Sequence, residues 1–154
     1  METVFYSASE NDTFAFGKAL GELAGPGTFI ALNGDLGTGK TVIAKGIAEG
    51  LGVSDRVTSP TFNIVKQYDG RCRLYHFDVY RISDPDEMHE IGFSDYLAGD
   101  AVVIAEWADM ISDLLPGERL TVGLEYDGDG RKITLKGTEK YSGLIDEIIR
   151  RAGR

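Results

Sequence analysis

Residues 34–41 read GDLGTGKT, a stretch in which three glycines are followed at once by Lys40 and Thr41. It matches the pattern G-x-x-x-x-G-K-[ST], in which each residue type has a physical task. Glycines lack a Cβ atom, so backbone N–H groups can turn inward and approach phosphate oxygens. The lysine ammonium would neutralise the β- and γ-phosphates, and the threonine hydroxyl would ligate Mg²⁺. The motif therefore predicts a site for a nucleoside triphosphate.

The segments on either side of this loop are typical of a strand and a helix. TFIALN (28–33) is a nearly continuous apolar run, as expected of a strand covered on both faces. KTVIAKGIAEGLG (40–52) has the spacing of a helix, with Ile43, Ile47 and Leu51 on one side. A helix that begins there would point its positive end at the phosphates. The predicted nucleotide contacts of the loop are Asp35, Leu36, Gly37, Thr38, Gly39, Lys40 and Thr41.

The rest of the chain alternates strands and helices first and turns to hairpins later. We predict strands over 3–9 and 101–107, hairpins around Asp69-Gly70 and around DGDG (127–130), and helices from about 9 to 23, over 83–97 with a break near Gly92, and over 138–151. In the last helix the residues expected to face inward are Leu144, Ile145, Ile148 and Ile149. The predicted fold class is α/β, a single P-loop NTPase-like domain over residues 1–154. Its mixed sheet would have parallel core strands and a late β-hairpin, with helices on both faces.

The composition, 42% apolar and 27% charged, is that of a soluble globular protein. No apolar run approaches the ~20 residues of a membrane span, and the first residues lack the pattern of a secretory signal. The single cysteine, Cys72, fits a reducing compartment, so we expect a cytoplasmic protein without membrane association. The net charge of -9 argues against a free-standing nucleic-acid binder and favours a basic protein partner.

Three further segments carry groups that phosphoryl transfer requires, namely a metal carboxylate, a sensor of the γ-phosphate and a group that positions the attacking oxygen. Glu106 ends the apolar run VVIAE and could hold the metal or be a solvated strand end. Thr61, in VTSPTF, offers a switch-like hydroxyl or simply precedes a strand. Asp78, in HFDVYR, would share a strand face with His76, where it could orient water or form a structural ion pair with Arg81.

Other residues that attract notice are expected to be structural. Trp107, the only tryptophan, is expected to pack in the fold or at an interface rather than to act in catalysis. We expect Cys72 in a strand and His89 on a helix surface, since neither has the neighbours that a metal site needs.

Four motifs, in this order and spacing, resemble the TsaE (YjeE) family: GDLGTGKT (34–41), VTSPTF (57–62), YHFDVYR (75–81) and AEW (105–107). The family comprises small P-loop ATPases of the bacterial machinery that installs threonylcarbamoyladenosine on tRNA. The resemblance covers nearly the whole chain, and the combination of HFDVYR with EW is more specific than the phosphate loop. It implies an Mg²⁺-dependent ATPase, slow alone and stimulated by partners, that supports turnover of the complex modifying tRNAs that read ANN codons.

The resemblance also implies a role for each matching position. Lys40 and Thr41 would hold phosphates and Mg²⁺, with Glu106 as the acidic partner of the metal. Asp78 would act in hydrolysis, and Thr61 would lie in a switch-like loop. The implied catalytic residues are thus Asp78, Thr61 and Lys40, and the implied metal ligands are Thr41 and Glu106. Further nucleotide contacts are implied at the start of the first helix and in the late hairpin, at Ser9, Thr13 and Arg131.

The implied cofactors are ATP or ADP with Mg²⁺, and the implied partners are two proteins. These are a catalytic subunit of the Gcp type and its inactive homologue, which make and transfer the threonylcarbamoyl group. Contact with tRNA would be indirect, because the partners would hold most of the RNA. Two other functions share the phosphate loop: a small-molecule kinase, although the chain has no recognisable arginine-rich lid, and a nucleotide-binding switch without significant hydrolysis.

Overall fold

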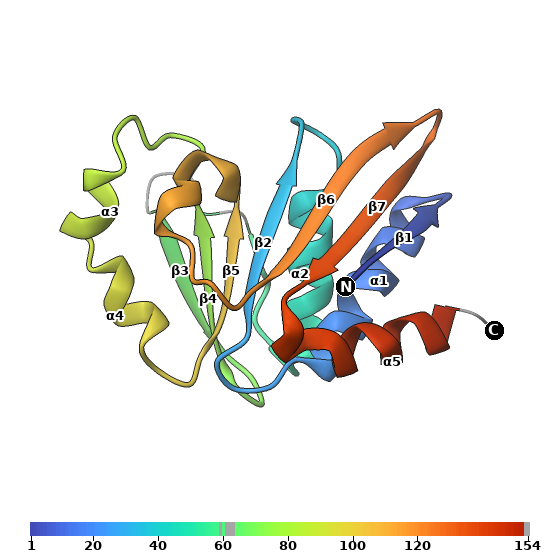
Figure 1. The fold of residues 1–154 in the computed structure, drawn as a ribbon, viewed down its shortest axis with the longest axis horizontal. Helices are drawn as coiled ribbons and strands as arrows, with labels where there is room; N and C mark the ends of the chain where they lie inside the picture. The colour runs from blue at the N-terminus through green and yellow to red at the C-terminus, as the bar shows by residue number, and fades with distance from the viewer. Residues whose placement is uncertain (59, 61–63, 153–154) are drawn as a thin grey trace.

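The computed structural model describes residues 1–58, 60 and 64–152, and a seven-stranded mixed sheet forms its centre (Figure 1). Across the sheet the strand order is β1-β7-β6-β2-β5-β4-β3. The strands are β1 (Glu2–Ser7), β2 (Phe29–Gly34), β3 (Val65–Asp69), β4 (Arg73–Asp78), β5 (Val102–Glu106), β6 (Leu120–Asp127) and β7 (Gly130–Gly137). The helices are α1 (Glu10–Leu23), α2 (Lys40–Gly50), α3 (Asp86–Glu90), α4 (Phe93–Leu97) and α5 (Ser142–Ala152), with 3₁₀ turns η1 (Ala108–Leu114) and η2 (Glu139–Tyr141).

The four central strands, β6, β2, β5 and β4, are parallel to one another. The antiparallel strands β7 and β1 extend one edge of this core, and β3 extends the other. The predicted mixed sheet with parallel core strands and a late β-hairpin is therefore confirmed. Because the carboxyl ends of β2, β4 and β5 meet at one edge, the loops that follow them surround a common space, which is where open α/β sheets bind ligands.

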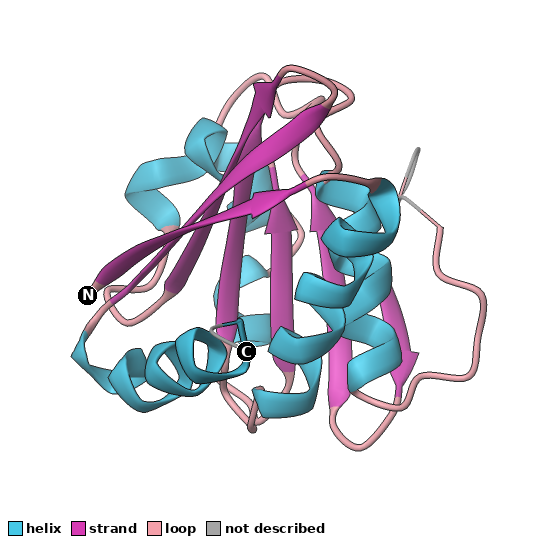
Figure 2. Cartoon of the chain, turned by 90° about the vertical axis from the view of Figure 1, so that its right-hand side faces the viewer, coloured by secondary structure: helices cyan, strands magenta, loops and turns pink. Residues whose placement is uncertain are grey.

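Helices cover both faces of the sheet, as the apolar run of β2 predicts (Figure 2). On one face, Ile30 and Leu32 pack in a core with residues of α1, α2 and α5. On the other, Phe29 and Ala31 pack with residues of α3, α4 and η1. The alternation of β2 side chains between the two clusters explains why this strand is apolar at successive positions.

Helices α1 and α2 pack so closely that there is no room for side chains between parts of their backbones. A Cβ atom added to Gly17 would lie 2.5 Å from the backbone oxygen of Ile43, and one added to Gly21 would lie 2.1 Å from that of Ile47. Glycines at this spacing on α1 therefore let its backbone approach that of α2 directly. The start of α1 is fixed by Ser9, whose side chain accepts a hydrogen bond from Asp12 N at 3.1 Å.

The structure departs from the sequence predictions at three places. Cys72 lies in the turn between β3 and β4 and not in a strand, because Asp69 pairs with Arg73 and leaves three residues to form the loop. Ile149 is 41% exposed, since α5 buries a narrower face centred on Ile145 and Ile148. The 3₁₀ turn η1 was not predicted. Within the residues described, none of the helices has both the length and the apolar character to cross a membrane.

Candidate nucleotide-binding site

The loop between β2 and α2 has a backbone that only glycine adopts readily. Gly34, Gly37 and Gly39 have φ angles of 154°, 80° and 112°. At Gly34 an added Cβ atom would also lie 2.7 Å from the backbone oxygen of Leu124, so the neighbouring strand β6 leaves no room for a side chain. The glycines of the motif are therefore required by the shape of the loop and by its close approach to β6.

Hydrogen bonds within the phosphate loop hold its shape, and the loop leads directly into the first turn of α2. Thr38 donates to Asp35 O from both its backbone nitrogen, at 3.2 Å, and its hydroxyl, at 2.7 Å. The helix α2 begins directly afterwards, at Lys40, and the first N–H groups of a helix have no partner within it. These amides and the positive end of the helix dipole form an anion site at the carboxyl edge of the sheet.

Lys40 is buried beneath this loop, with 5% of its surface exposed. Its ammonium donates to Gly34 O at 2.6 Å and to Asp35 O at 2.9 Å, and it lies 3.9 Å from the ring centroid of Trp107. Burial lowers the pKa of Lys40 below its ordinary value, although nearby carboxylates, Glu106 foremost, act in the opposite direction. The cation is thus held on neutral carbonyls and an aromatic face, where a phosphate would be a stronger acceptor.

Glu106 is a buried carboxylate with a partner on each oxygen. Its Oε1 accepts a hydrogen bond from the Thr41 hydroxyl at 3.0 Å, and its Oε2 lies 2.5 Å from Nε2 of His76. Only 2% of the residue is exposed, so the alternative of a solvated strand end is excluded. The parallel register places Glu106 opposite Leu32 of β2, next to the phosphate loop, which explains how a residue 65 positions away meets Thr41.

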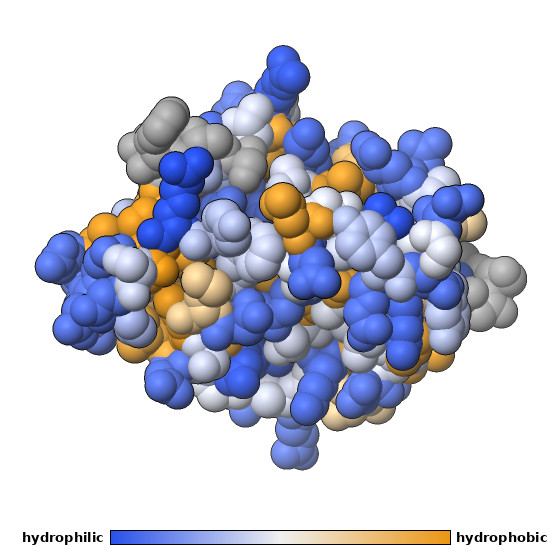
Figure 3. All heavy atoms as spheres, turned by 90° about the horizontal axis from the view of Figure 1, so that it is seen from above, coloured by the Kyte–Doolittle hydropathy of each residue, from blue (hydrophilic) through white to orange (hydrophobic). Residues whose placement is uncertain are grey.

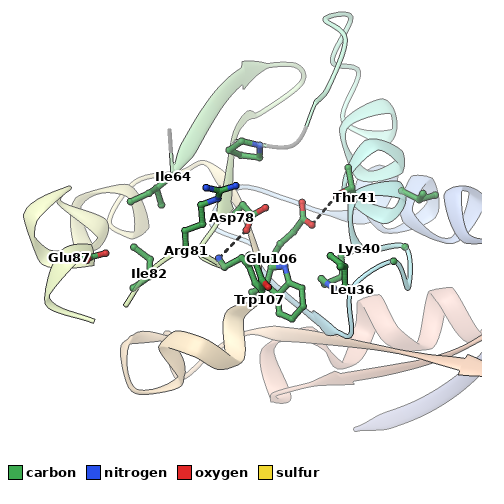
Figure 4. Close-up of a pocket in the computed structure, with 15 residues that line it drawn as sticks. Leu36, Lys40, Thr41, Ile64, Asp78, Arg81, Ile82, Glu87, Glu106 and Trp107 are labelled. Carbon is green, nitrogen blue, oxygen red and sulfur yellow. Dashed lines mark hydrogen bonds between the residues drawn. The ribbon is translucent and has the colours of Figure 1, made fainter. Parts of the chain in front are cut away.

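Asp78 ends β4 at the same level of the sheet. It is paired with Glu106 in the parallel register of β4 and β5, and its Oδ1 accepts a hydrogen bond from Tyr80 N at 3.0 Å. In Figure 4 its carboxylate lies near that of Glu106, on the side away from Leu36. The structure therefore brings Asp78, Glu106, Thr41 and Lys40 to one site from three different strand-loop segments.

These residues line a cavity of about 610 Å³, a size common for ligand pockets. Its described lining contains two cations, Lys40 and Arg81, and three carboxylates, Asp78, Glu87 and Glu106. The remaining lining residues are Leu36, Gly37, Gly39, Thr41, Val42, Pro60, Ile64, Tyr80, Ile82 and Trp107. Figure 3 views the molecule onto this edge and shows hydrophobic surface on the side of α3 and α4, next to hydrophilic surface.

A second, smaller cavity of about 110 Å³ lies against the same loop. It is lined by Ser9, Thr13 and Arg131, the three positions implied at the first helix and the late hairpin, and it shares Gly37 and Gly39 with the larger cavity. The structure thus brings these distant segments together beside the phosphate loop. Asp35 lines neither cavity, and its contribution to the contacts described is its backbone oxygen.

The late hairpin also holds the phosphate loop from outside. Arg131 donates from Nε to Thr38 O at 3.0 Å, and its guanidinium lies 4.6 Å from the ring centroid of Tyr126. The Tyr126 hydroxyl donates to Leu36 O at 2.6 Å. Arg131 is therefore bonded to the loop backbone.

Three residues of the site were not predicted from the sequence. The sequence pattern puts His76 on the face of Asp78 without indicating a partner and gives no signal for Tyr126, and it favours packing in the fold or at an interface for Trp107. Trp107 follows Glu106 with a φ of 60°, the only positive φ of a non-glycine residue in the described chain, and this turn lays its ring under Lys40. Thr61, in the predicted switch-like segment, lies outside the described residues.

The residues present fit a magnesium-bound nucleotide. Among the described residues, no group of three or more His, Cys, Asp or Glu could hold a metal ion alone. Mg²⁺ bound with nucleotides normally takes only one or two protein oxygens and completes its shell with phosphates and water. The Thr41 hydroxyl and the Glu106 carboxylate offer oxygen atoms of this kind, and the glycine loop next to them leaves space where side chains would block phosphates.

A parallel-core sheet, a glycine loop that opens onto a helix and a lysine followed by a hydroxyl define a nucleotide-binding protein of the P-loop class. The sequence profile of the family described as threonylcarbamoyl adenosine biosynthesis protein TsaE matches residues 7–133. The chain belongs to this family, which takes part in the biosynthesis of threonylcarbamoyladenosine on tRNA. The resemblance inferred from the four motifs is therefore confirmed.

Individual relatives cover most of the chain. The tRNA threonylcarbamoyladenosine biosynthesis protein TsaE of Bacillus subtilis (strain 168) is 42% identical over 147 residues, which cover 94% of this chain and 92% of that protein. The TsaE protein of Treponema pallidum (strain Nichols) is 38% identical over 130 residues, covering 84% and 96%. The crystal structure of B. subtilis YdiB has a TM-score of 0.82 at 36% identity, covering 99% of this chain and 97% of that one.

Proposed function

We propose that residues 1–154 form a single ATPase domain that uses Mg²⁺ to hydrolyse ATP to ADP and phosphate. This activity would support turnover of the complex that forms threonylcarbamoyladenosine on tRNAs reading ANN codons. The observation that carries the proposal is the 3.0 Å contact between Thr41 Oγ1 and Glu106, in a cavity also lined by Lys40 and Asp78. A phosphate loop and a strand-end carboxylate held this close supply the protein ligands that a magnesium-bound triphosphate needs.

Phosphate binding follows from the loop and from Lys40. The amides at the start of α2 would donate to the phosphate oxygens, and the glycines leave the space that this approach requires. Lys40 would exchange its bonds to Gly34 O and Asp35 O for bonds to charged phosphate oxygens, which are stronger acceptors. Because burial disfavours the charged form of Lys40, an anionic ligand would also raise its pKa.

Hydrolysis would depend on Asp78. Its carboxylate lies at the end of β4, across the cavity from the phosphate loop, where it could orient a water molecule towards the terminal phosphate. Mg²⁺, when bound, would neutralise charge on the phosphates, with Thr41 and Glu106 as its protein ligands. Arg81 is the second cation of the cavity and would add positive charge near the reacting group.

The nucleoside end of ATP would occupy the second cavity. Gly37 and Gly39 line both cavities, so a phosphate chain on the loop could continue from one to the other. The hydroxyls of Ser9 and Thr13 and the guanidinium of Arg131 would contact the nucleoside there. This assignment is supported by the meeting of α1 and the late hairpin beside the loop.

The proposed partners are a catalytic subunit of the Gcp type and its inactive homologue. An acidic chain is unsuited to hold tRNA by itself, so contact with the RNA would pass through these proteins. The proposed assembly acts on tRNA and implies a cytoplasmic location. Hydrolysis would be slow in the isolated chain if a partner must order the site before water can attack.

Phosphate release, measured with and without the two partner proteins and substrate tRNA, tests this function. Release that depends on Mg²⁺ and rises when partners and tRNA are added is the expected result. Transfer of phosphate to a metabolite would instead identify a small-molecule kinase. Tight binding of ATP without turnover under any of these conditions would identify a nucleotide-binding switch, and either result would refute the proposed ATPase.

A further inference from the structure

His76 is fully buried and touches the proposed metal ligand, but the function described so far does not use it. The residue has 0% of its surface exposed, and its Nε2 lies 2.5 Å from Glu106 Oε2. Histidine is seldom buried this completely, and a buried polar side chain usually has at least one hydrogen-bond partner. Its position therefore calls for an explanation beyond packing.

The strand register explains how the imidazole reaches Glu106. On the sheet face below α2, β4 presents Leu74, His76 and Asp78 in turn, and the parallel pairing sets Asp78 beside Glu106 and His76 beside Ile104. His76 is thus diagonal to Glu106 across the two strands, two residues before Asp78 in β4. From there it contacts the carboxylate oxygen that Thr41 does not use.

The other nitrogen of the ring indicates which tautomer is present. Nδ1 of His76 is buried and has no hydrogen-bond partner among the described residues. A proton on Nδ1 would be a buried donor without an acceptor, whereas a proton on Nε2 points at a carboxylate. A proton on Nε2, directed at the Glu106 carboxylate, is therefore the placement that fits this site.

We propose that His76 is a positioning residue, which donates from Nε2 to Glu106 Oε2 and so keeps Oε1 turned towards Thr41 for the divalent cation. The inference rests on the proposed function, because it takes Glu106 and Thr41 as the protein ligands of Mg²⁺. A buried carboxylate without this donor would be free to turn away from Thr41. Partners that orient ligands in this way typically change metal affinity about 10- to 100-fold when they are removed.

Three variants separate positioning from packing. His76→Leu removes the donor, His76→Gln restores an amide donor at a similar distance along the side chain, and Leu74→Val trims the same face of β4 without touching Glu106. Calorimetry would measure the affinity for a non-hydrolysable ATP analogue over a series of Mg²⁺ concentrations and in its absence. Urea denaturation would record the stability of each variant separately.

The expected result is that His76→Leu raises the Mg²⁺ concentration giving half-maximal enhancement of analogue binding at least about 10-fold, with little change in the Mg²⁺-free affinity. His76→Gln should stay within about threefold of the wild type, and so should Leu74→Val although it is less stable. An unchanged Mg²⁺ requirement in His76→Leu would overturn the proposal. So would a Gln variant as impaired as the Leu variant, or an equal shift in the Leu74→Val control.

A measurement on the wild-type chain keeps the proposal testable if the Leu variant fails to fold. Nitrogen-15 NMR should find the His76 proton on Nε2, in slow exchange with water, and its resonance should move when Mg²⁺ and the analogue are added together. A proton on Nδ1 alone would refute the proposal. If the wild type bound no nucleotide, the proposed function would fail, whereas the hydrogen bond to Glu106 would still be decided by this spectrum.

Discussion

Replacing Lys40 with methionine should lower the affinity for nucleotide strongly while it changes the stability of the unliganded fold very little. The substitution removes the ammonium but keeps a long apolar side chain that can still pack on Trp107. It deletes two hydrogen bonds, to Gly34 O at 2.6 Å and to Asp35 O at 2.9 Å. At the same time it removes a charged group that is only 5% exposed.

Without nucleotide, these effects oppose each other. Hydrogen bonds of a charged group contribute about 1.5–3 kcal/mol each, so the two together cost roughly 3–6 kcal/mol. Burying a charge carries a desolvation penalty of similar or greater size, which the variant no longer has. The free energy of unfolding of the unliganded protein should therefore change by no more than about 1 kcal/mol.

With nucleotide, the variant also lacks the stronger contacts to phosphate that Lys40 would make in exchange for its bonds to Gly34 O and Asp35 O. Hydrogen bonds to charged groups contribute about 1.5–3 kcal/mol each, and Lys40 would contact both the β- and the γ-phosphate. A loss of about 3 kcal/mol corresponds to an affinity roughly 100-fold lower, since each 1.4 kcal/mol is a factor of ten. We expect at least this decrease for the Mg²⁺-bound ATP analogue.

Calorimetric titration and urea denaturation of the same preparation measure both quantities. Lys45→Met is the matched control, because Lys45 is exposed on the same helix and lines neither cavity. An affinity of Lys40→Met within about threefold of the wild type would refute the assigned contact to phosphates. A loss of several kcal/mol of stability without nucleotide would refute the balance of hydrogen bonding and desolvation.

Three further predictions concern hydrolysis, helix packing and pH. Asp78→Asn should bind the ATP analogue normally but release phosphate about 100-fold more slowly, and normal turnover in a steady-state assay would exclude the role of Asp78 in orienting water. Gly21→Ala should lose about 1–3 kcal/mol in urea denaturation, because its methyl group would lie 2.1 Å from a backbone oxygen of α2. Gly25→Ala, which has open space, is the control and should change stability by less than about 0.5 kcal/mol; equal losses would show that helix contact is not the cause. Finally, burial lowers the pKa of Lys40 in the folded chain from its ordinary 10.5. At a pH between the pKa of the folded chain and that of the unfolded chain, the unfolded chain therefore binds more protons. The unfolding free energy of the wild type should then rise relative to Lys40→Met as the pH approaches 10.5, and parallel pH profiles would contradict this.

The sequence alone determined the elements and the phosphate loop. The period of two in LTVGLEY and RKITLKG, the apolar run of TFIALN and the glycines of GDLGTGKT each reflect conformational preferences within a few residues. These preferences do not depend on distant segments of the chain, so the sequence predicts β2, the loop and α2 near their observed bounds. The same reasoning failed at Cys72, because the length of the turn depends on which residues pair across the hairpin.

Only the tertiary structure decided which groups meet at the loop. Asp78 and Glu106 are neighbours because β4 and β5 are parallel in one register, and a shift of a single residue between the two strands would put the two carboxylates on opposite faces of the sheet. His76 acquired its contact with Glu106 through the same register, and Arg131 reached the loop because β6 lies beside β2. Strand order and register are set by how whole faces of the sheet pack against the helices. The side-chain pattern of one short segment does not specify which strand it pairs with or in which register.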